Sequence, residues 1–338
     1  TWTHTLSVVA GSVIVAVVGG AACAAELDIS RLDNGLTVIL HREPVAPRVS
    51  VNLCYRVGSS DEPAGKSGMA HLLEHLMFEG SAHVPPGAFD AWLQEAGGQA
   101  NAATGEDATF YWLDLPPGAL ELALFLESDR MGFLSGAIDE RLFEEQKRIV
   151  AAEREYIAES DPSIAEEWVA RPALFPDGHP YHEPVIGNPE EFNALGVADV
   201  LGFYQRHYRP GNASLVVAGD IDIEATRALV TKWFSEIPKG QVAAAPVAAP
   251  PTSREGRSLA RQVASPGSRL SVHWPSAPAG SPDHAALVVL ADLLAGGPGS
   301  RLHESLVREQ GIAVAVSARQ EGLRLGGVFT IEAETVPG

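Results

Sequence analysis

The sequence predicts an α+β protein built from two related parts. Alternating apolar residues are typical of strands at 28–40, 49–57 and 99–115, whereas the apolar residues of 69–78 recur at helical spacing. An alanine- and proline-rich tract at 242–251 marks a linker, after which the strand and helix pattern partly begins again. The 338-residue length accommodates two domains, and a hydrophobic content of 46% suffices for a core.

The elements can be placed in order along the first part. A turn at Asp33-Asn34-Gly35 divides 28–40 into a pair of strands. Further elements are a strand at 49–57, helices at 69–78 and about 86–96, strands within 99–115, helices as far as 193–207, and a strand at 213–218.

The most informative short motif is His71-Leu72-Leu73-Glu74-His75. The apolar side chains of this helix form one stripe, so His71 and His75 lie one turn apart on the other side, where both imidazoles can reach the same ion. Glu74 lies beside them, within reach of a water on that ion. The pattern H-x-x-E-H is the inverse of the H-E-x-x-H motif of zinc peptidases. The alternative is a pair of solvated surface histidines.

A second unusual feature is Glu153, in a helix predicted at 139–159. Glu153 points along the apolar face of this helix, where a carboxylate is costly unless a cation or a metal pairs with it. Two histidines and one carboxylate, with a fourth position left for water, form a common catalytic zinc set. The alternative is a buried salt bridge from Glu153 to Arg148 or Arg130. The expected apolar face consists of Leu142, Ile149, Val150, Tyr156 and Ile157.

These residues lie within a longer stretch of sequence that resembles the pitrilysin and mitochondrial-processing-peptidase family of inverted-motif zinc peptidases. The resemblance extends from about residue 27 to the end of the chain. The matching segments are Gly58-Ser59-Ser60-Asp61-Glu62, Gly68-Met69-Ala70, Met77-Phe78-Glu79-Gly80, Ala96-Gly97-Gly98, Asn101-Ala102, Thr104, Thr109, Ile149-Val150-Ala151-Ala152-Glu153-Arg154, His179-Pro180-Tyr181 and Tyr208-Arg209-Pro210-Gly211-Asn212-Ala213.

The resemblance implies a fold and a set of residue roles. The fold would be roll-like, with two homologous halves, each a mostly antiparallel sheet packed with helices. The ligands of one Zn²⁺ per chain would be His71, His75 and Glu153. Glu74 would be the general base that takes a proton from water as it attacks the peptide carbonyl.

Two further sites take their meaning from the resemblance. In family members the strand that corresponds to Asn101 and Ala102 pairs with the substrate backbone; by itself, Asn101 reads as an ordinary turn or edge-strand residue. Many members carry a second glutamate one heptad before the ligand, where this chain has Gln146. Glutamine can hydrogen-bond without adding charge, so we expect Gln146 to support the site from beside it.

The second part reads as a degenerate duplicate of the first. Residues 269–272 resemble 48–51, and the helix at about 286–294 precedes a glycine pair as the histidine helix precedes Gly80. Aligned in this way, the second helix keeps its packing face and lacks metal ligands. The expected organisation is a signal segment at 1–25, a catalytic domain at 26–241, a linker at 242–258 and a shorter, truncated second domain at 259–338. The positions of His71, Glu74 and His75 become Val288, Ala291 and Asp292.

One departure from the family bears on partners. Self-sufficient members carry an arginine and a tyrosine seven residues apart in the second half, and these positions align with Val307 and Val314, with Arg308 one residue out of register. We therefore expect this chain to supply the metal half of a two-chain enzyme, with a homologous partner subunit supplying the missing pair. The alternative is that valine is tolerated and another residue takes the role.

The charge balance excludes one class of partner. With 43 acidic and 24 basic residues, the net charge is −19, so nucleic acid is an unfavourable partner. The expected substrate is a peptide or unfolded polypeptide, and the acidity favours neutral or basic ones.

The N-terminal residues indicate export. Residues 6–25 are apolar, carry no charge and end in Ala22-Cys23-Ala24-Ala25, which is typical of a signal-peptide core with its cleavage site. This predicts a periplasmic protein; the alternatives are a retained membrane anchor or lipidation at Cys23. Cys54 would then be the one remaining cysteine, buried in its strand.

Together these observations predict a zinc-dependent endopeptidase. The alternatives are a non-catalytic scaffold of the same fold, as some relatives are, or a peptide-binding subunit without turnover. The intact ligand trio with Glu74 favours the enzyme.

Overall fold

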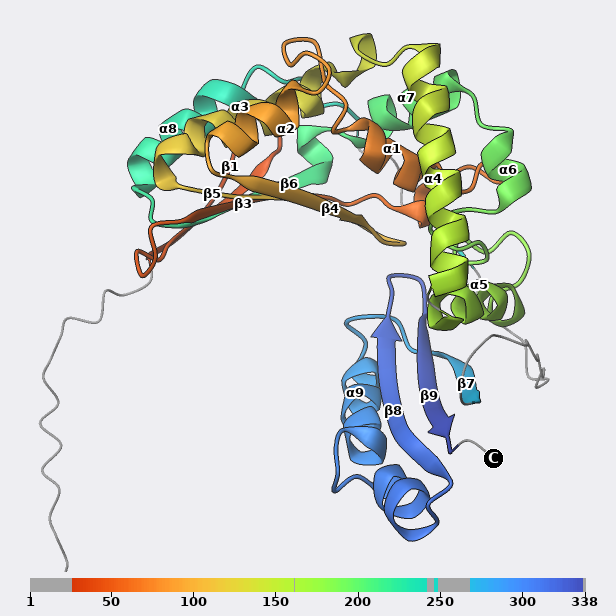
Figure 1. The fold of residues 1–338 in the computed structure, drawn as a ribbon. Helices are drawn as coiled ribbons and strands as arrows, with labels where there is room; N and C mark the ends of the chain where they lie inside the picture. The colour runs from red at the N-terminus through yellow and green to blue at the C-terminus, as the bar shows by residue number, and fades with distance from the viewer. Residues whose placement is uncertain (1–25, 161, 242–245, 249–267, 337–338) are drawn as a thin grey trace, which may run out of the picture.

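The computed structural model describes residues 26–160, 162–241, 246–248 and 268–336, which form an arched first half and a smaller second half (Figure 1). The expected signal segment, with Cys23, and most of the expected linker at 242–258 lie outside the described residues.

The first half is organised around one six-stranded sheet. Its order is β1-β2-β6-β3-β5-β4, and every neighbouring pair is antiparallel except β2 with β6. The α+β class predicted from the sequence is therefore confirmed. The strands are β1 (Glu26–Arg31), β2 (Thr37–Arg42), β3 (Val49–Tyr55), β4 (Gln99–Thr104), β5 (Thr109–Leu115) and β6 (Ala213–Gly219).

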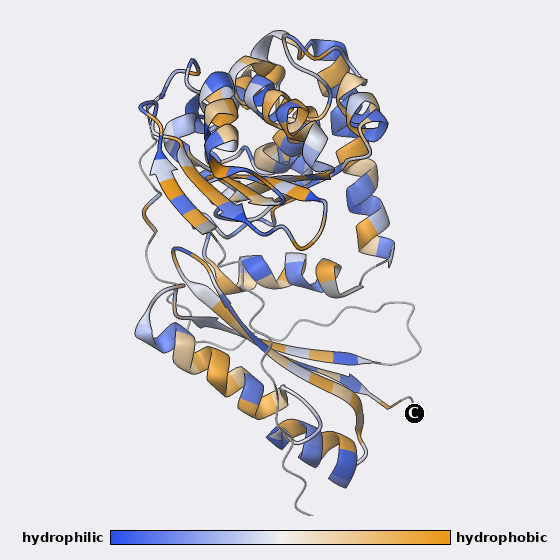
Figure 2. Ribbon diagram, turned by 90° about the vertical axis from the view of Figure 1, so that its left-hand side faces the viewer, coloured by the Kyte–Doolittle hydropathy of each residue, from blue (hydrophilic) through white to orange (hydrophobic). Residues whose placement is uncertain are grey.

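Helices cover one face of this sheet and leave the other open (Figure 1). Alternation along the strands explains the arrangement: Val49, Val51 and Leu53 of β3 are buried, whereas the residues between them are only partly covered. Figure 2 shows hydrophobic and hydrophilic residues alternating along the strands in the same way. Cys54 lies on the open face and is partly exposed, so its expected burial was wrong. The helices are α1 (Met69–Leu76), α2 (Ala88–Glu95), α3 (Leu120–Phe133), α4 (Glu140–Ser160), α5 (Pro162–Leu174), α6 (Pro189–Asn193), α7 (Val197–His207) and α8 (Ile223–Phe234).

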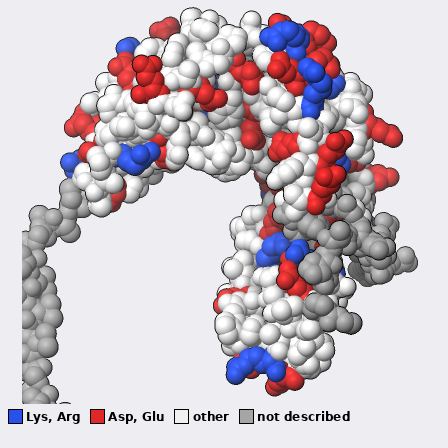
Figure 3. Space-filling view, in the orientation of Figure 1, with Lys and Arg blue, Asp and Glu red and all other residues white. Residues whose placement is uncertain are grey.

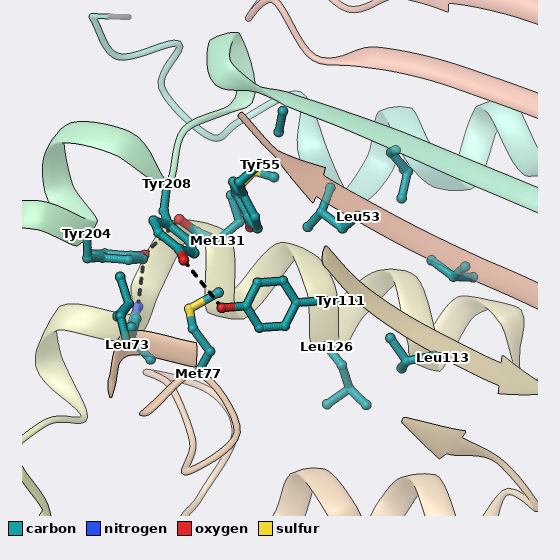
Figure 4. Packing of buried hydrophobic residues seen from close by; sticks show 14 of the residues in the cluster. Leu53, Tyr55, Leu73, Met77, Tyr111, Leu113, Leu126, Met131, Tyr204 and Tyr208 are labelled. Atoms are coloured by element: carbon teal, nitrogen blue, oxygen red, sulfur yellow. Dashed lines mark hydrogen bonds between the residues drawn. The ribbon is translucent and has the colours of Figure 1, made fainter. Parts of the chain in front are cut away.

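The core between sheet and helices contains an aromatic cluster with a buried ion pair. Tyr55, Tyr111 and Tyr208 pack ring against ring, and the Tyr111 and Tyr208 hydroxyls lie 3.5 Å apart (Figure 4). The Arg130 guanidinium lies 4.3 Å from the centre of the Tyr111 ring and donates to Glu127 at 2.9 Å. Pairing with a carboxylate and aromatic faces offsets part of the cost of this buried charge. The pairing is incomplete, because the buried Arg130 Nη1 atom has no hydrogen-bond partner among the described residues.

The second half repeats the strand and helix order of the first. Both contain a strand, two helices and two strands, and their sheet orders, β3-β5-β4 and β7-β9-β8, correspond strand by strand. This agreement supports the duplication inferred from the sequence. The second set is β7 (Arg269–Ser276), α9 (Pro282–Ala295), the π-helix η5 (His303–Glu309), β8 (Ala313–Gly322) and β9 (Gly327–Thr335).

The apolar stripe of α9 is less covered than the sequence predicts. Leu72, Leu73 and Leu76 of α1 are buried beneath α4, α7 and the sheet, whereas their counterparts on α9 are 41–59% exposed. Among the described residues of the second half, β8 is the main element that packs against α9. The expected packing face is therefore apolar in sequence but largely exposed. These counterparts are Val289, Leu290 and Leu293.

A hydrogen-bonded junction joins the two halves at the β8–β9 turn. The Tyr181 hydroxyl donates to Asp107 at 2.9 Å and accepts from the Leu325 backbone N–H at 2.8 Å. The Arg324 backbone N–H donates to the same aspartate at 2.6 Å. Phe175 and Val328 pack around Tyr181, so the junction combines polar contacts with a small apolar core.

No helix within the described part of the chain is both long and apolar enough to cross a membrane.

The junction gives a testable prediction about stability. Tyr181→Phe removes a buried hydroxyl and leaves the Leu325 N–H without its acceptor, so we expect the free energy of unfolding to fall by about 1–3 kcal/mol. Urea unfolding followed by tryptophan fluorescence measures the change. Tyr156→Phe is the matched control, since Tyr156 is 70% exposed. An equal effect of the two substitutions would show that the junction hydroxyl is not what stabilises the contact.

Candidate active site

Helix α1 presents the H-x-x-E-H side chains because its N-terminus and its apolar face are fixed. Gly68 begins the helix with φ +85°, and a Cβ there would lie 2.8 Å from the Ile186 carbonyl oxygen, so glycine is required. The Glu62 carboxylate accepts hydrogen bonds from the backbone N–H groups of Gly68 (3.1 Å) and Ala70 (2.7 Å). It thereby satisfies donors that a helix N-terminus leaves free. The sequence motif quoted for the family contains Glu62, but this capping role was not predicted.

Glu153 of α4 meets the two histidines across the helix contact. Its Oε2 atom lies 3.2 Å from His75 Nε2 and 3.9 Å from His71 Nε2. One donor atom from each of the three residues lies within 4.8 Å of the other two. The alternative salt bridge is absent: Arg130 pairs with Glu127, and Arg148 donates to the Glu144 carbonyl.

The protonation states of His71 and Glu153 suit a cation. Burial lowers the pKa of His71 to about 4, against an opposing effect of Glu153, so its ring is neutral at pH 7. The neighbouring His75 lowers the pKa of Glu153, which keeps the carboxylate charged. Glu153 Oε2 is buried and accepts no hydrogen bond within the described structure. Two imidazole nitrogens and an unsatisfied carboxylate oxygen that converge on one point fit a zinc ion.

The predicted apolar face of α4 was partly wrong. Val150 and Leu142 are buried, but Ile149 is 45% exposed and Tyr156 70% exposed. The buried stripe instead passes through Phe143, Gln146, Lys147 and Val150, rotated toward α1. Glu153 still lies on this side of the helix, which is why it reaches the histidines.

Glu74 lies beside the trio and is held by a strand. The Thr104 hydroxyl of β4 donates a short hydrogen bond to the Glu74 carboxylate. Burial raises the pKa of Glu74, whereas the Thr104 bond and His75 oppose the rise. A carboxylate with a raised pKa is a stronger base, which suits it to take a proton. Thr104 is among the residues that resemble the family, but the sequence predicted no role for it, because no local pattern shows that β4 approaches α1.

Asn101 and Ala102 lie on β4, an edge strand that pairs with β5 alone among the described strands. Asn101 is exposed, and its side-chain oxygen accepts from the Ala102 backbone N–H at 2.8 Å. Gln146 is buried and donates at 2.7 Å to Glu79, which follows the end of α1 four residues after His75. The structure therefore brings Gln146 near the site through Glu79.

The corresponding positions of the second half have no such geometry. Val288 of α9 is 46% exposed and Ala291 is buried, and the described residues contain the histidine–glutamate trio as their one candidate metal cluster. Val307 lies on η5, and Val314 is an exposed residue of β8.

Known proteins place the chain in a family. Residues 37–181 match the family described as insulinase (peptidase family M16), and residues 194–338 match the peptidase M16 inactive domain. An uncharacterized zinc protease of Mycobacterium leprae is 30% identical over 91% of this chain and 68% of its own length. The chain belongs to peptidase family M16. The resemblance stated from the sequence is thereby confirmed.

Solved structures of two proteases show the same fold. A protease from Helicobacter pylori matches with a TM-score of 0.82 and 26% identity over 93% of this chain and 76% of its own. Pitrilysin matches with a TM-score of 0.77 and 21% identity over 94% of this chain but only 34% of its own. The M16 inactive-domain match begins at residue 194, yet β6 lies inside the first sheet, so that boundary does not coincide with the division between the sheets.

The contact between Gln146 and Glu79 gives a prediction about charge. Gln146→Glu replaces the donor with a second carboxylate next to Glu79, whose pKa burial already raises. We expect a loss of about 1–3 kcal/mol in the free energy of unfolding at pH 8. Repulsion between the two carboxylates raises the pKa of the pair in the folded protein above its value in the unfolded chain. As the pH falls, the folded protein therefore binds a proton before the unfolded chain does, and this proton removes the repulsion. The deficit should therefore shrink as the pH falls toward 5.

Urea unfolding of both proteins across this pH range measures the effect. Gln205→Glu, at an exposed position of α7, is the matched control and should change little at any pH. A deficit that is independent of pH would contradict the assigned contact.

Proposed function

We propose that this chain is a zinc-dependent endopeptidase that hydrolyses peptides or unfolded polypeptides. The observation that carries the proposal is the convergence of Glu153 on His71 and His75, with Glu74 adjacent but engaged by Thr104 rather than by the trio. Such a division leaves one carboxylate to hold a metal and one to move a proton. The zinc-protease names of M16 relatives support the same assignment.

The residues that would hold zinc are His71, His75 and Glu153. The donor set fits because it supplies two imidazole nitrogens and one carboxylate oxygen from two helices that pack together. When bound in a site of this type, zinc acts as a Lewis acid that makes water nucleophilic near neutral pH and stabilises negative charge on oxygen.

Glu74 would carry the proton during hydrolysis. Its carboxylate takes the proton of the attacking water and then delivers it to the amine nitrogen of the departing peptide. The pKa of Glu74, raised by burial, makes its carboxylate a stronger base and favours the first transfer. The Thr104 hydrogen bond lowers the pKa and so favours the second transfer, in which Glu74 gives the proton up. Thr104 also fixes the carboxylate relative to β4, where the substrate would lie.

The edge strand would align the substrate backbone. Ala102 presents its N–H away from β5, since that group is bonded by the Asn101 side chain rather than by the ladder. A peptide can add to such an edge as a further strand, with main-chain hydrogen bonds giving affinity. Displacement of the Asn101 side chain would open the Ala102 donor to the substrate.

Partner and location are part of the proposal. Val307 and Val314 stand where the family resemblance places an arginine and a tyrosine, so we propose that a homologous subunit completes the enzyme. Full activity of the chain alone would contradict this. Export to the periplasm is proposed from residues 1–25, and secretion of a fused reporter would test it.

Glu74→Gln tests the division of roles. The amide cannot accept a proton, so we expect kcat/KM on an unstructured polypeptide to fall by about 10²–10⁴-fold while zinc content is unchanged. Protease assays together with elemental mass spectrometry measure both. Glu159→Gln, an exposed residue of α4, serves as the control. Retained activity, or loss of zinc in the Glu74 variant, would contradict the assignment of Glu74 as the proton carrier.

A further inference from the structure

The open face of the first sheet carries an ordered set of side chains beside the free edge of β4. Register places Ala103 opposite Phe110, Asn101 opposite Trp112, and Gln99 opposite Asp114. In β5 these residues alternate with buried ones, and in β4 the three exposed residues alternate with partly buried ones, so all six belong to the open face. This face lines the hollow between the two halves in Figure 3.

The two ends of this array differ in chemistry. Phe110 is 41% exposed, and the small Ala103 beside it leaves the ring uncovered toward the free edge. At the other end, the partly buried Asp114 carboxylate makes no hydrogen bond or ion pair with any side chain that the structure describes. One end therefore offers an aromatic surface and the other an unpaired negative charge.

A cavity of about 660 Å³ lies at the Asp114 end of this array. Its lining includes Gln99, Asp114 and Ser50 from one cross-strand row, with Glu43 and Arg48 from the β2–β3 connection. Two carboxylates and one guanidinium leave a net negative wall, in a chain of net charge −19. A cationic side chain is the complementary occupant.

We propose that β4 and this open face select an extended peptide that carries a large apolar side chain and, four residues away, a lysine or arginine. The inference rests on the proposed function, because it assumes that the peptide adds to β4. In an added strand, residues opposite Ala103 and Gln99 project onto the open face. The first lies beside Phe110, and the second points across Gln99 toward Asp114.

Dimensions agree with this assignment. Neighbouring strands lie about 4.8 Å apart, so the backbone of the peptide residue opposite Gln99 lies about 9.5 Å from the backbone of β5. A lysine or arginine side chain and the Asp114 side chain can together span this distance. A short side chain cannot. The residue between the two positions on this face lies opposite Asn101, next to Trp112, and the aromatic ring there tolerates many side chains.

The test measures binding rather than turnover. Fluorescein-labelled ten-residue Ala/Ser peptides with Phe and Arg four positions apart, in both orders, are titrated against zinc-loaded Glu74→Gln protein by anisotropy. Partner peptides replace Arg by Glu or Phe by Gly. For at least one order, we expect Arg→Glu to raise Kd by about threefold or more at low salt, and less at high salt.

Two variants locate the effect. Asp114→Asn should abolish most of the Arg-over-Glu preference and keep the Phe preference, whereas Phe110→Ala should do the reverse. Glu236→Gln, an exposed carboxylate just after α8, controls for a change in net charge and should alter neither. Circular dichroism verifies that each variant is folded.

The outcomes separate the two proposals. If Asp114→Asn leaves the Arg-over-Glu preference intact, or no preference exists in either order, the inference is overturned. If wild-type protein then still cleaves an unstructured polypeptide, only the inference has failed. If wild-type protein binds no zinc and cleaves nothing, the proposed function has failed, whatever the peptide preferences are.

Discussion

The packing of α4 against α1 is the contact on which the candidate site depends. Neither helix alone holds a metal set, because α1 supplies two imidazoles and α4 supplies the carboxylate. The contact is fixed by burial: the leucines of α1 and Val150 of α4 belong to the same core. Because interiors are close-packed, a shift of either helix would be resisted by many neighbours. The donor atoms are therefore preorganised before any ion binds.

Local periodicity predicts much of this site but not its connections. His71, Glu74 and His75 share a helix, so spacing alone places them together. Glu153 was found because a carboxylate on a buried helix face is unusual, even though Ile149 and Tyr156 of the expected face are exposed. By contrast, the Thr104 bond to Glu74 joins a strand to a helix. A contact between two elements that are distant in the sequence produces no periodic pattern in it.

The same distinction applies to the fold. Hairpins and amphipathic helices were predictable, whereas the insertion of β6 between β2 and β3 was not, since its only signal is a short apolar run. Duplication was visible as a repeated pattern and reappears as the same strand order in both sheets. The exposure of the α9 stripe was not predictable, because a helix sequence specifies an apolar face without specifying what covers it.

The most direct measurement of the central claim is the zinc content of the purified, zinc-supplemented chain by elemental mass spectrometry, in wild type and Glu153→Gln. Glu155→Gln, an exposed neighbour on the same helix, is the control. We expect one zinc per chain in wild type and control, and a strongly reduced content in Glu153→Gln under the same chelator challenge. A folded wild-type protein without zinc, or a Glu153→Gln variant that retains it fully, would contradict the three-residue metal site.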